Sequence, residues 1–298
     1  MNYSILKYIL GYVLKIEAAF MLLPCVTSLI YHEKEGRYFF LVSCVCMLLG
    51  VLMTYRKPKN TVFYLKEGCL ATSLSWIILS LFGAIPFWIS GEIPQWENAL
   101  FETISGFTTT GATVLSNVEG LSHTALIWRS FTHWIGGMGV LVFLLAILPL
   151  SGGSSINLMR AESPGPSVGK LVPKVRYTAM ILYTIYFGMT VIEFIFLLAG
   201  KMPVFDALTT AFGTAGTGGF GIKNDSIMGY SPYIQWVVAI FMILFGINFN
   251  FYFYILYRHF RKAISMEEIH YYLAMILIAV TIIFLNVRTC LLYTSDAA

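Results

Sequence analysis

The stretch from Phe101 to Thr113 reads Phe-Glu-Thr-Ile-Ser-Gly-Phe-Thr-Thr-Thr-Gly-Ala-Thr. It lies between two long apolar segments, yet it is short, rich in threonine and carries a glycine near its end. This composition predicts a short helix that leads into a narrow extended loop. Within a bilayer, non-helical backbone is tolerated only where protein buries it or where it lines a water-filled cavity. We therefore expect a re-entrant element surrounded by protein.

A second copy of this pattern lies 108 residues further along the chain. That shift brings Thr109 onto Thr217, Gly111 onto Gly219 and Trp128 onto Trp236 without a gap. Weak internal symmetry of this kind is the sequence signature of repeats in transporters. The sequence thus predicts two helix–loop–helix repeats, each with its own short loop.

Both loops place threonine first and glycine third, which is the Thr-x-Gly-x-x pattern of a potassium filter. An extended loop can point its carbonyl oxygens at a common axis, where they replace the hydration shell of a potassium ion. A packing role for the glycines and threonines alone does not explain why two loops share one register. The predicted ion-binding residues are Thr109, Thr110, Gly111, Ala112 and Thr113 in the first loop, and Thr217, Gly218, Gly219, Phe220 and Gly221 in the second.

The composition excludes several classes of protein. The chain is 58% apolar and 11% charged, whereas about a quarter of the residues in a soluble domain are charged. Its five cysteines and five histidines form no metal-ligand or disulfide pattern, and we find no phosphate loop, dinucleotide fingerprint or nucleophile–base arrangement. We therefore expect a membrane protein that is not an enzyme and has no cofactor. Its net charge of +4 reflects membrane topology rather than a nucleic-acid partner.

The apolar runs predict the order of the membrane helices. They cover about 5–30, with a kink at Pro24, and then 38–54, 68–90, 124–149, 177–199, 233–257 and 269–287. The fold class is all-α and integral to the membrane, built from potassium-channel-like helix–pore loop–helix repeats. Residues 1–66 form a two-helix extension, 67–150 the first repeat, 151–176 a cytoplasmic connector, 177–262 the second repeat, and 263–298 the first helix of a truncated third repeat with a non-native-looking tail.

Charge asymmetry predicts the orientation of these helices. Eleven lysines and arginines lie in the connectors after the second, fourth and sixth helices, against four after the first, third and fifth. The positive-inside rule therefore places the N-terminus in the cytoplasm and lets both loops enter from outside. The outer connectors also hold acids that form either a cation-attracting vestibule or ordinary solvated loop charges: Glu33, Glu35, Glu92, Glu97, Glu102, Glu119, Asp206 and Asp225.

Several single residues in the apolar segments have more than one interpretation. Trp128 and Trp236 are expected to anchor helix ends rather than to contact ions. Arg129 is expected to pair with an outer acid or with loop carbonyls, and a direct role in ion repulsion is the alternative. Glu193 is expected to bond a neighbouring polar group, because an unpaired intramembrane acid is costly. Asn248 either lines an inner pore or bonds between helices.

These segments resemble the Trk/Ktr/HKT superfamily of potassium transporters, and most closely its bacterial TrkH type. The resemblance rests on the first loop together with Trp128-Arg-Ser-Phe-Thr-His-Trp-Ile-Gly-Gly-Met-Gly139, and on the two extra N-terminal helices. It implies four helix–loop–helix repeats around one pseudo-fourfold pore and a homodimer of two separate pores. It also implies a cytoplasmic nucleotide-binding regulatory subunit of the TrkA type and a location in the bacterial inner membrane. Gly111 fits the potassium-selective members, whereas a serine there goes with sodium in some plant members.

The chain departs from this family pattern in having two loops rather than four. We therefore expect an N-terminal fragment, and we expect residues 291–298 not to continue the seventh helix. The function that the loops favour is potassium uptake across the cytoplasmic membrane. The alternative is a secondary transporter of another small solute, or a sodium/potassium symporter, that uses the loops as broken-helix binding elements. Against it, the loops offer carbonyls and hydroxyls rather than a charged or varied polar pocket.

Overall fold

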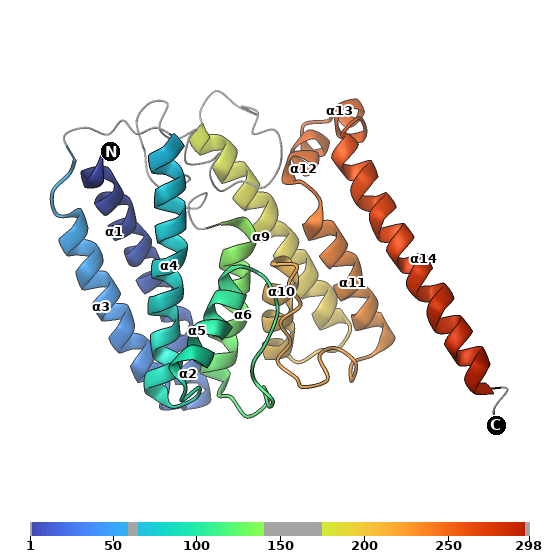
Figure 1. Cartoon of the computed structure of the whole chain (residues 1–298), viewed down its shortest axis with the longest axis horizontal. Coiled ribbons are helices and arrows are strands. Elements are labelled where there is room, and N and C mark those ends of the chain that lie inside the picture. Colours follow the sequence, from blue (N-terminus) through green and yellow to red (C-terminus); the bar gives the residue numbers. More distant parts are fainter. Residues whose placement is uncertain (1, 59–64, 140–174, 296–298) are drawn as a thin grey trace. The chain divides into compact units, whose positions relative to one another are not determined.

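The computed structural model describes residues 2–58, 65–139 and 175–295, and all regular structure within these ranges is helical (Figure 1). Within these residues, five helical spans are long and apolar enough to cross a membrane, or six if α11 and α12 count as one broken span. The chain divides into two compact units, Met1–Phe245 and Gly246–Ala298, and each is described by itself.

The first unit begins with the N-terminal extension, which is formed by α1 (Tyr3–Phe20), α2 (Leu22–Tyr31) and α3 (Gly36–Thr54). The expected kink at Pro24 is a break at Met21, between α1 and α2. Proline lacks an N–H group and its ring clashes with the carbonyl four residues earlier, which here belongs to Phe20. α1 packs against α3 and α4.

The first repeat follows as α4 (Leu65–Ser90), α5 (Trp96–Phe107) and α6 (His123–Met138). α4 has the length of a membrane span, whereas α5 is a 12-residue helix. We expected the helix after the loop to run unbroken to residue 149, but α6 ends at Met138. The reason is Gly139, which adopts a φ of 80° that does not continue a right-handed helix. Residues 140–149 of that prediction, and the connector up to residue 174, lie outside the described residues.

The second repeat starts with α9 (Val175–Ala199) and α10 (Val204–Ala215), followed by α11 (Pro232–Gly246). α10 packs against both α6 and α9, so α6 of the first repeat contacts the short helix of each repeat. The predicted single helix over 233–257 is wrong, because α11 stops at Gly246 and α12 (Phe249–Leu256) starts anew after Asn248.

The second unit holds α12, α13 (Phe260–Ile264) and α14 (Glu267–Ser295). Asn248 caps α12 by accepting a hydrogen bond from the Asn250 amide, and its side chain donates to Glu268 at 2.8 Å. Of the two interpretations of Asn248, the helix-to-helix bond is therefore the observed one. α14 continues to Ser295, so the expectation that the last residues would not extend this helix is wrong as far as Ser295. That part of the chain has neither proline nor glycine to stop a helix.

Candidate functional site

The two short helices α5 and α10 are matched in length and position. α5 covers Trp96–Phe107 and α10 covers Val204–Ala215, so the helices are 12 residues each and both ends obey the 108-residue shift. Each is preceded by a long apolar helix and followed by a loop without regular structure. The internal repeat read from the sequence is therefore a repeat of structure.

Both helix–loop segments return to the side from which they enter. Glu92, which precedes α5, accepts hydrogen bonds at 3.2 and 3.3 Å from the Ser122 amide, which precedes α6. In the second repeat the Tyr230 hydroxyl, which precedes α11, donates at 2.7 Å to Asp206 in the first turn of α10. These two bonds join entrance and exit, which is the geometry of a re-entrant element.

The loop backbones share an unusual conformation. In the first loop φ is 53° at Thr109 and 73° at Gly111, and in the second it is 56° at Thr217 and 72° at Gly219. The residues between them, Thr110 and Gly218, do not have a positive φ. Alternation of this kind turns successive peptide groups the same way, so that N–H groups gather on one side of the chain and carbonyl oxygens on the other.

The two threonines carry strain at equivalent places. A β-branched residue with a positive φ is a genuine outlier. Such residues cost about 1–3 kcal/mol each and cluster at active sites and ligand-binding sites. Thr109 and Thr217 follow the last turns of α5 and α10, where Thr108 and Gly216 cap the helices. That both repeats keep the same strained residue indicates a shared task for the loop backbone.

The two loops lie against each other. A Cβ built on Gly111 would meet the Gly218 carbonyl oxygen at 1.9 Å, and one built on Gly218 would meet the Thr109 carbonyl oxygen at 2.8 Å. Gly219 is different, because the nearest atom to its added Cβ is a methionine methyl carbon at 3.7 Å. A glycine is therefore required at position 111 both by the close approach of the second loop and by the positive φ. At position 219 it is required by the positive φ alone.

The ten predicted filter residues fall into two groups by what their carbonyl oxygens do. The Ala112 oxygen accepts a hydrogen bond from the Ser105 hydroxyl at 2.6 Å, and the Gly221 oxygen accepts one from Arg129 at 2.6 Å. Among the residues that the structure describes, none donates a hydrogen bond to the carbonyl oxygens of the other eight residues. Those oxygens are left without a hydrogen bond from these residues, whereas the carbonyl oxygens of Ala112 and Gly221 fix the loops to the surrounding protein.

Helix α6 passes between the ends of the two short helices because it carries two adjacent glycines. An added Cβ at Gly136 would lie 2.3 Å from the Phe107 carbonyl oxygen, at the end of α5. One at Gly137 would lie 3.1 Å from the Ala215 carbonyl oxygen, at the end of α10. Small residues let helix backbones approach closely within a membrane. Here they let the ends of α5 and α10, from which both loops start, pack against α6.

Trp128 of α6 is not the helix-end anchor that we expected. Its side chain is fully buried, and its indole N–H donates to the Gly83 carbonyl oxygen of α4 at 3.0 Å. Trp236, at the equivalent place in α11, is 69% exposed and its expected anchoring role stays a prediction. The difference arises because the N-terminal extension and α4 cover the first repeat at this position, with Phe39 of α3 packed edge to face on Trp128.

Two acidic residues have roles other than those predicted. Glu102 does not belong to an outer vestibule, because its side chain is buried and paired with Arg129 at 2.9 Å. Arg129 was expected to pair with an acid or with a loop carbonyl, and it makes both bonds. Glu193 of α9 is buried, and neither of its carboxyl oxygens has a hydrogen-bond partner among the described residues, so the bond expected there is not found. The nearby Thr214 hydroxyl donates to the Thr210 carbonyl oxygen instead.

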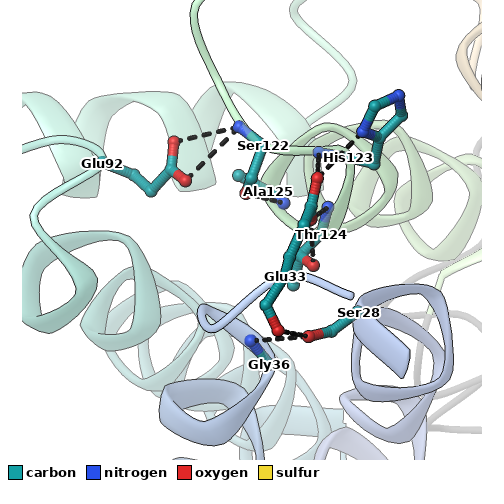
Figure 2. A network of polar contacts seen from close by, with 8 residues as sticks. All are labelled: Ser28, Glu33, Gly36, Glu92, Ser122, His123, Thr124 and Ala125. Carbon is teal, nitrogen blue, oxygen red and sulfur yellow. Dashed lines mark hydrogen bonds and ion pairs between the residues drawn. The ribbon is translucent and has the colours of Figure 1, made fainter. Parts of the chain in front are cut away.

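Two further acids hold the start of α6 (Figure 2). Glu33, in the connector between α2 and α3, accepts bonds from the amides of His123 and Thr124 at 2.9 Å and from the Thr124 hydroxyl at 2.6 Å. Glu92 binds the Ser122 amide next to them. The first amides of a helix lack partners within it, and carboxylates are favoured there. The N-terminal extension is thereby fastened to the re-entrant segment.

These two carboxyl groups differ in acidity. Partial burial acts to raise the pKa of Glu33, but hydrogen bonds from Thr124 and His123 outweigh it and the pKa lies below its ordinary value. Burial raises the pKa of Glu92, and repulsion by Glu35 and Glu33 adds to this against the bonds from Ser122. A lowered carboxyl pKa contributes stability above the pKa of the unfolded chain, which is lost as pH falls through the folded-state pKa. The raised pKa of Glu92 has the opposite effect: it contributes stability below the pKa of the unfolded chain, which is lost as pH rises through the folded-state pKa.

We expect Glu33→Gln to lower the melting temperature in detergent near pH 7, because an amide has one acceptor oxygen where the carboxylate has two. The deficit should shrink as the pH falls below about 4, the ordinary range of a glutamate, because wild-type Glu33 then becomes protonated. Glu92→Gln is the matched control and should show no such loss near neutral pH. Equal melting temperatures of Glu33→Gln and wild type at pH 7 would contradict this role of Glu33.

Comparison with known proteins agrees with this geometry. The sequence pattern that defines the TrkH family, described as a cation transport protein, matches residues 35–295. The chain belongs to the TrkH family. Membership of this family of cation transport proteins and the apolar helical spans together indicate that the chain is a multi-pass membrane protein.

Named relatives include two potassium uptake proteins. TrkH of Salmonella typhimurium, a Trk system potassium uptake protein, is 36% identical over 263 residues, which are 86% of this chain and 54% of the relative. TrkG of Escherichia coli, named likewise, is 31% identical over 274 residues, 90% of this chain and 56% of the relative. The chain thus spans about half the length of the curated relatives that it matches.

A solved structure has the same fold. The crystal structure of the potassium transporter TrkH from Vibrio parahaemolyticus matches 94% of this chain and 57% of its own, with a TM-score of 0.74 and 28% identity. The fold of this chain, with its short helices and re-entrant loops, is therefore the TrkH fold.

Proposed function

We propose that this chain forms part of a pore for potassium uptake across the cytoplasmic membrane, lined by backbone carbonyl oxygens of the two re-entrant loops. The observation that carries the proposal is the matched backbone, with positive φ at Thr109 and Gly111 and again at Thr217 and Gly219. Carbonyl oxygens gathered on one side of such loops suit a bare monovalent cation. The names of the relatives as potassium uptake proteins support the same ion.

Two loops supply two sides of a filter, and we propose that the complete pore takes two more. The chain aligns with 54% of Salmonella TrkH, which leaves length in that relative for further repeats. The ten residues predicted from the sequence remain the proposed filter. Within it, the carbonyl oxygens of Ala112 and Gly221 are assigned to support rather than to ion contact.

Family membership supports further proposals about assembly and location. We propose a homodimer and a cytoplasmic nucleotide-binding regulatory subunit of the TrkA type, as components of a Trk system. We place the protein in the bacterial inner membrane with the N-terminus in the cytoplasm, because basic residues such as Arg56 and Lys57 and acidic ones such as Glu92 and Glu119 fall in alternate connectors. The protein is proposed to be no enzyme, to need no cofactor beyond the transported potassium, and to bind no nucleic acid.

Rubidium uptake by the full-length gene product tests this function. In a host that lacks its own potassium uptake systems, we expect expression to restore growth at low potassium and to drive rubidium uptake that potassium inhibits strongly and sodium weakly. The empty vector is the control. Membrane-inserted protein that gives no rubidium uptake, or uptake that sodium and potassium inhibit equally, would overturn the proposal.

A further inference from the structure

Glu102, in the middle of α5, joins three parts of the molecule from a buried position. Its Oε1 accepts a hydrogen bond from the Thr113 hydroxyl at 2.5 Å and one from the Val114 amide at 2.7 Å. Its Oε2 accepts a hydrogen bond from Arg129 Nε at 2.9 Å. The carboxylate therefore holds the outer end of the first loop and links it to α6 through Arg129.

Arg129 also contacts the second loop. Its terminal nitrogen donates to the Gly221 carbonyl oxygen at 2.6 Å, at the outer end of the second loop. Its guanidinium carbon lies 3.5 Å from the centre of the Phe220 ring, and the His133 ring packs on the same phenylalanine at 4.2 Å between ring centres. A planar guanidinium with several fixed donors can bind a carboxylate and a carbonyl and stack on a ring at once, which an ammonium cannot.

The second repeat has no such pair at the equivalent positions. The 108-residue shift places Thr210 opposite Glu102 and Val237 opposite Arg129, although the loop backbones themselves coincide. A pair that served only its own repeat would leave the second loop without this support. The single pair of the first repeat instead contacts both loops, and its side chains are 2% and 0% exposed.

We propose that the Arg129–Glu102 pair is a specificity-determining positioning device, which sets the spacing between the outer ends of the two filter loops. This inference rests on the proposed function and deepens it. Potassium and sodium carry the same charge and differ in size, so discrimination depends on where carbonyl oxygens are held and how many there are. A loop end released from Gly221 or Thr113 can close around the smaller ion.

The test uses two conservative variants of the full-length protein. Arg129→Lys keeps the positive charge beside Glu102 but loses the guanidinium group that also reaches Gly221. Glu102→Gln keeps an acceptor for the first loop but breaks the ion pair. For both we expect sodium to inhibit rubidium uptake at about tenfold lower concentration than in wild type, a change of about 1.4 kcal/mol in relative binding. Arg37→Lys, an exposed arginine, is the matched control.

The sodium inhibition constant of rubidium uptake separates a positioning role of this pair from a purely structural one. A structural defect lowers the maximal rate through fewer active molecules and leaves the sodium inhibition constant unchanged. Wild type that does not take up rubidium would overturn the proposed function itself. Wild type that is selective, with both variants inserted and equally selective, would overturn this inference and leave the function standing. Failure of both variants to insert while Arg37→Lys inserts would assign the pair to folding and also overturn the inference.

Discussion

Replacing Gly111 with serine is expected to abolish rubidium uptake by the full-length protein. The added Cβ would lie 1.9 Å from the Gly218 carbonyl oxygen, so one loop must move away from the other. The φ of 73° adds a cost of about 1–2 kcal/mol for any residue with a side chain. The obstacle is backbone rather than a flexible side chain, and the structure has no cheap way to relieve it.

Two comparisons isolate this effect. Gly219→Ser meets the same unfavourable φ but no close neighbour, and it should retain measurable uptake. Gly188→Ser, in α9, has no neighbouring atom of the described residues within 4 Å of the added Cβ and should behave as wild type. The measurement is initial rubidium uptake normalised to the amount of protein in the membrane. Wild-type uptake by Gly111→Ser would contradict the close contact between the two loops.

The second large effect is expected from Gly136→Ala. In a helix this change usually gains about 0.5–1 kcal/mol, but here the methyl group would lie 2.3 Å from the Phe107 carbonyl oxygen and 2.8 Å from the Thr109 side chain. Overpacking of this kind costs about 1–3 kcal/mol, so we expect a lower melting temperature in detergent. Because the displaced residues lead into the first loop, transport should fall with stability.

Gly188→Ala is the matched control for this change. It lies in the interior of α9 with open space around it, so the helix propensity of alanine should act alone and raise or preserve the melting temperature. Opposite signs for the two Gly→Ala changes are the expected outcome. A Gly136→Ala protein at least as stable as wild type would show that α6 does not press against the end of α5 as described.

Much of the fold follows from spacing along the chain. The 108-residue shift predicted two equivalent loops, and their φ values agree within 3° because threonine and glycine recur at the same positions. The lengths of α3, α4 and α9 followed from apolar runs. The break between α1 and α2 followed from Pro24, since a proline acts on the carbonyl four residues earlier. Arg129 was predicted to pair with an acid or with a loop carbonyl, in keeping with the cost of an unpaired charge inside the membrane.

What the sequence could not show depends on contacts between distant segments. Glu102 carries the same charge as the acids of the outer loops, and only its place on the buried face of α5 removes it from that group. Trp128 and Trp236 occupy the same step of the repeat, but α3 and α4 cover only the first. The caps formed by Glu33 and Glu92 join residues 90 and 30 positions apart, and no local pattern signals such bonds.

Ion preference in Gly219→Ser tests most directly whether these loops select the ion. The substitution adds a hydroxyl beside the filter backbone without a clash, so the protein should insert normally while the spacing of the carbonyl oxygens changes. The quantity to measure is the sodium concentration that halves rubidium uptake, for wild type, Gly219→Ser and Gly188→Ser. We expect this concentration to fall in Gly219→Ser alone. An unchanged value in an inserted, transporting Gly219→Ser protein would mean that the loops are not the selectivity filter.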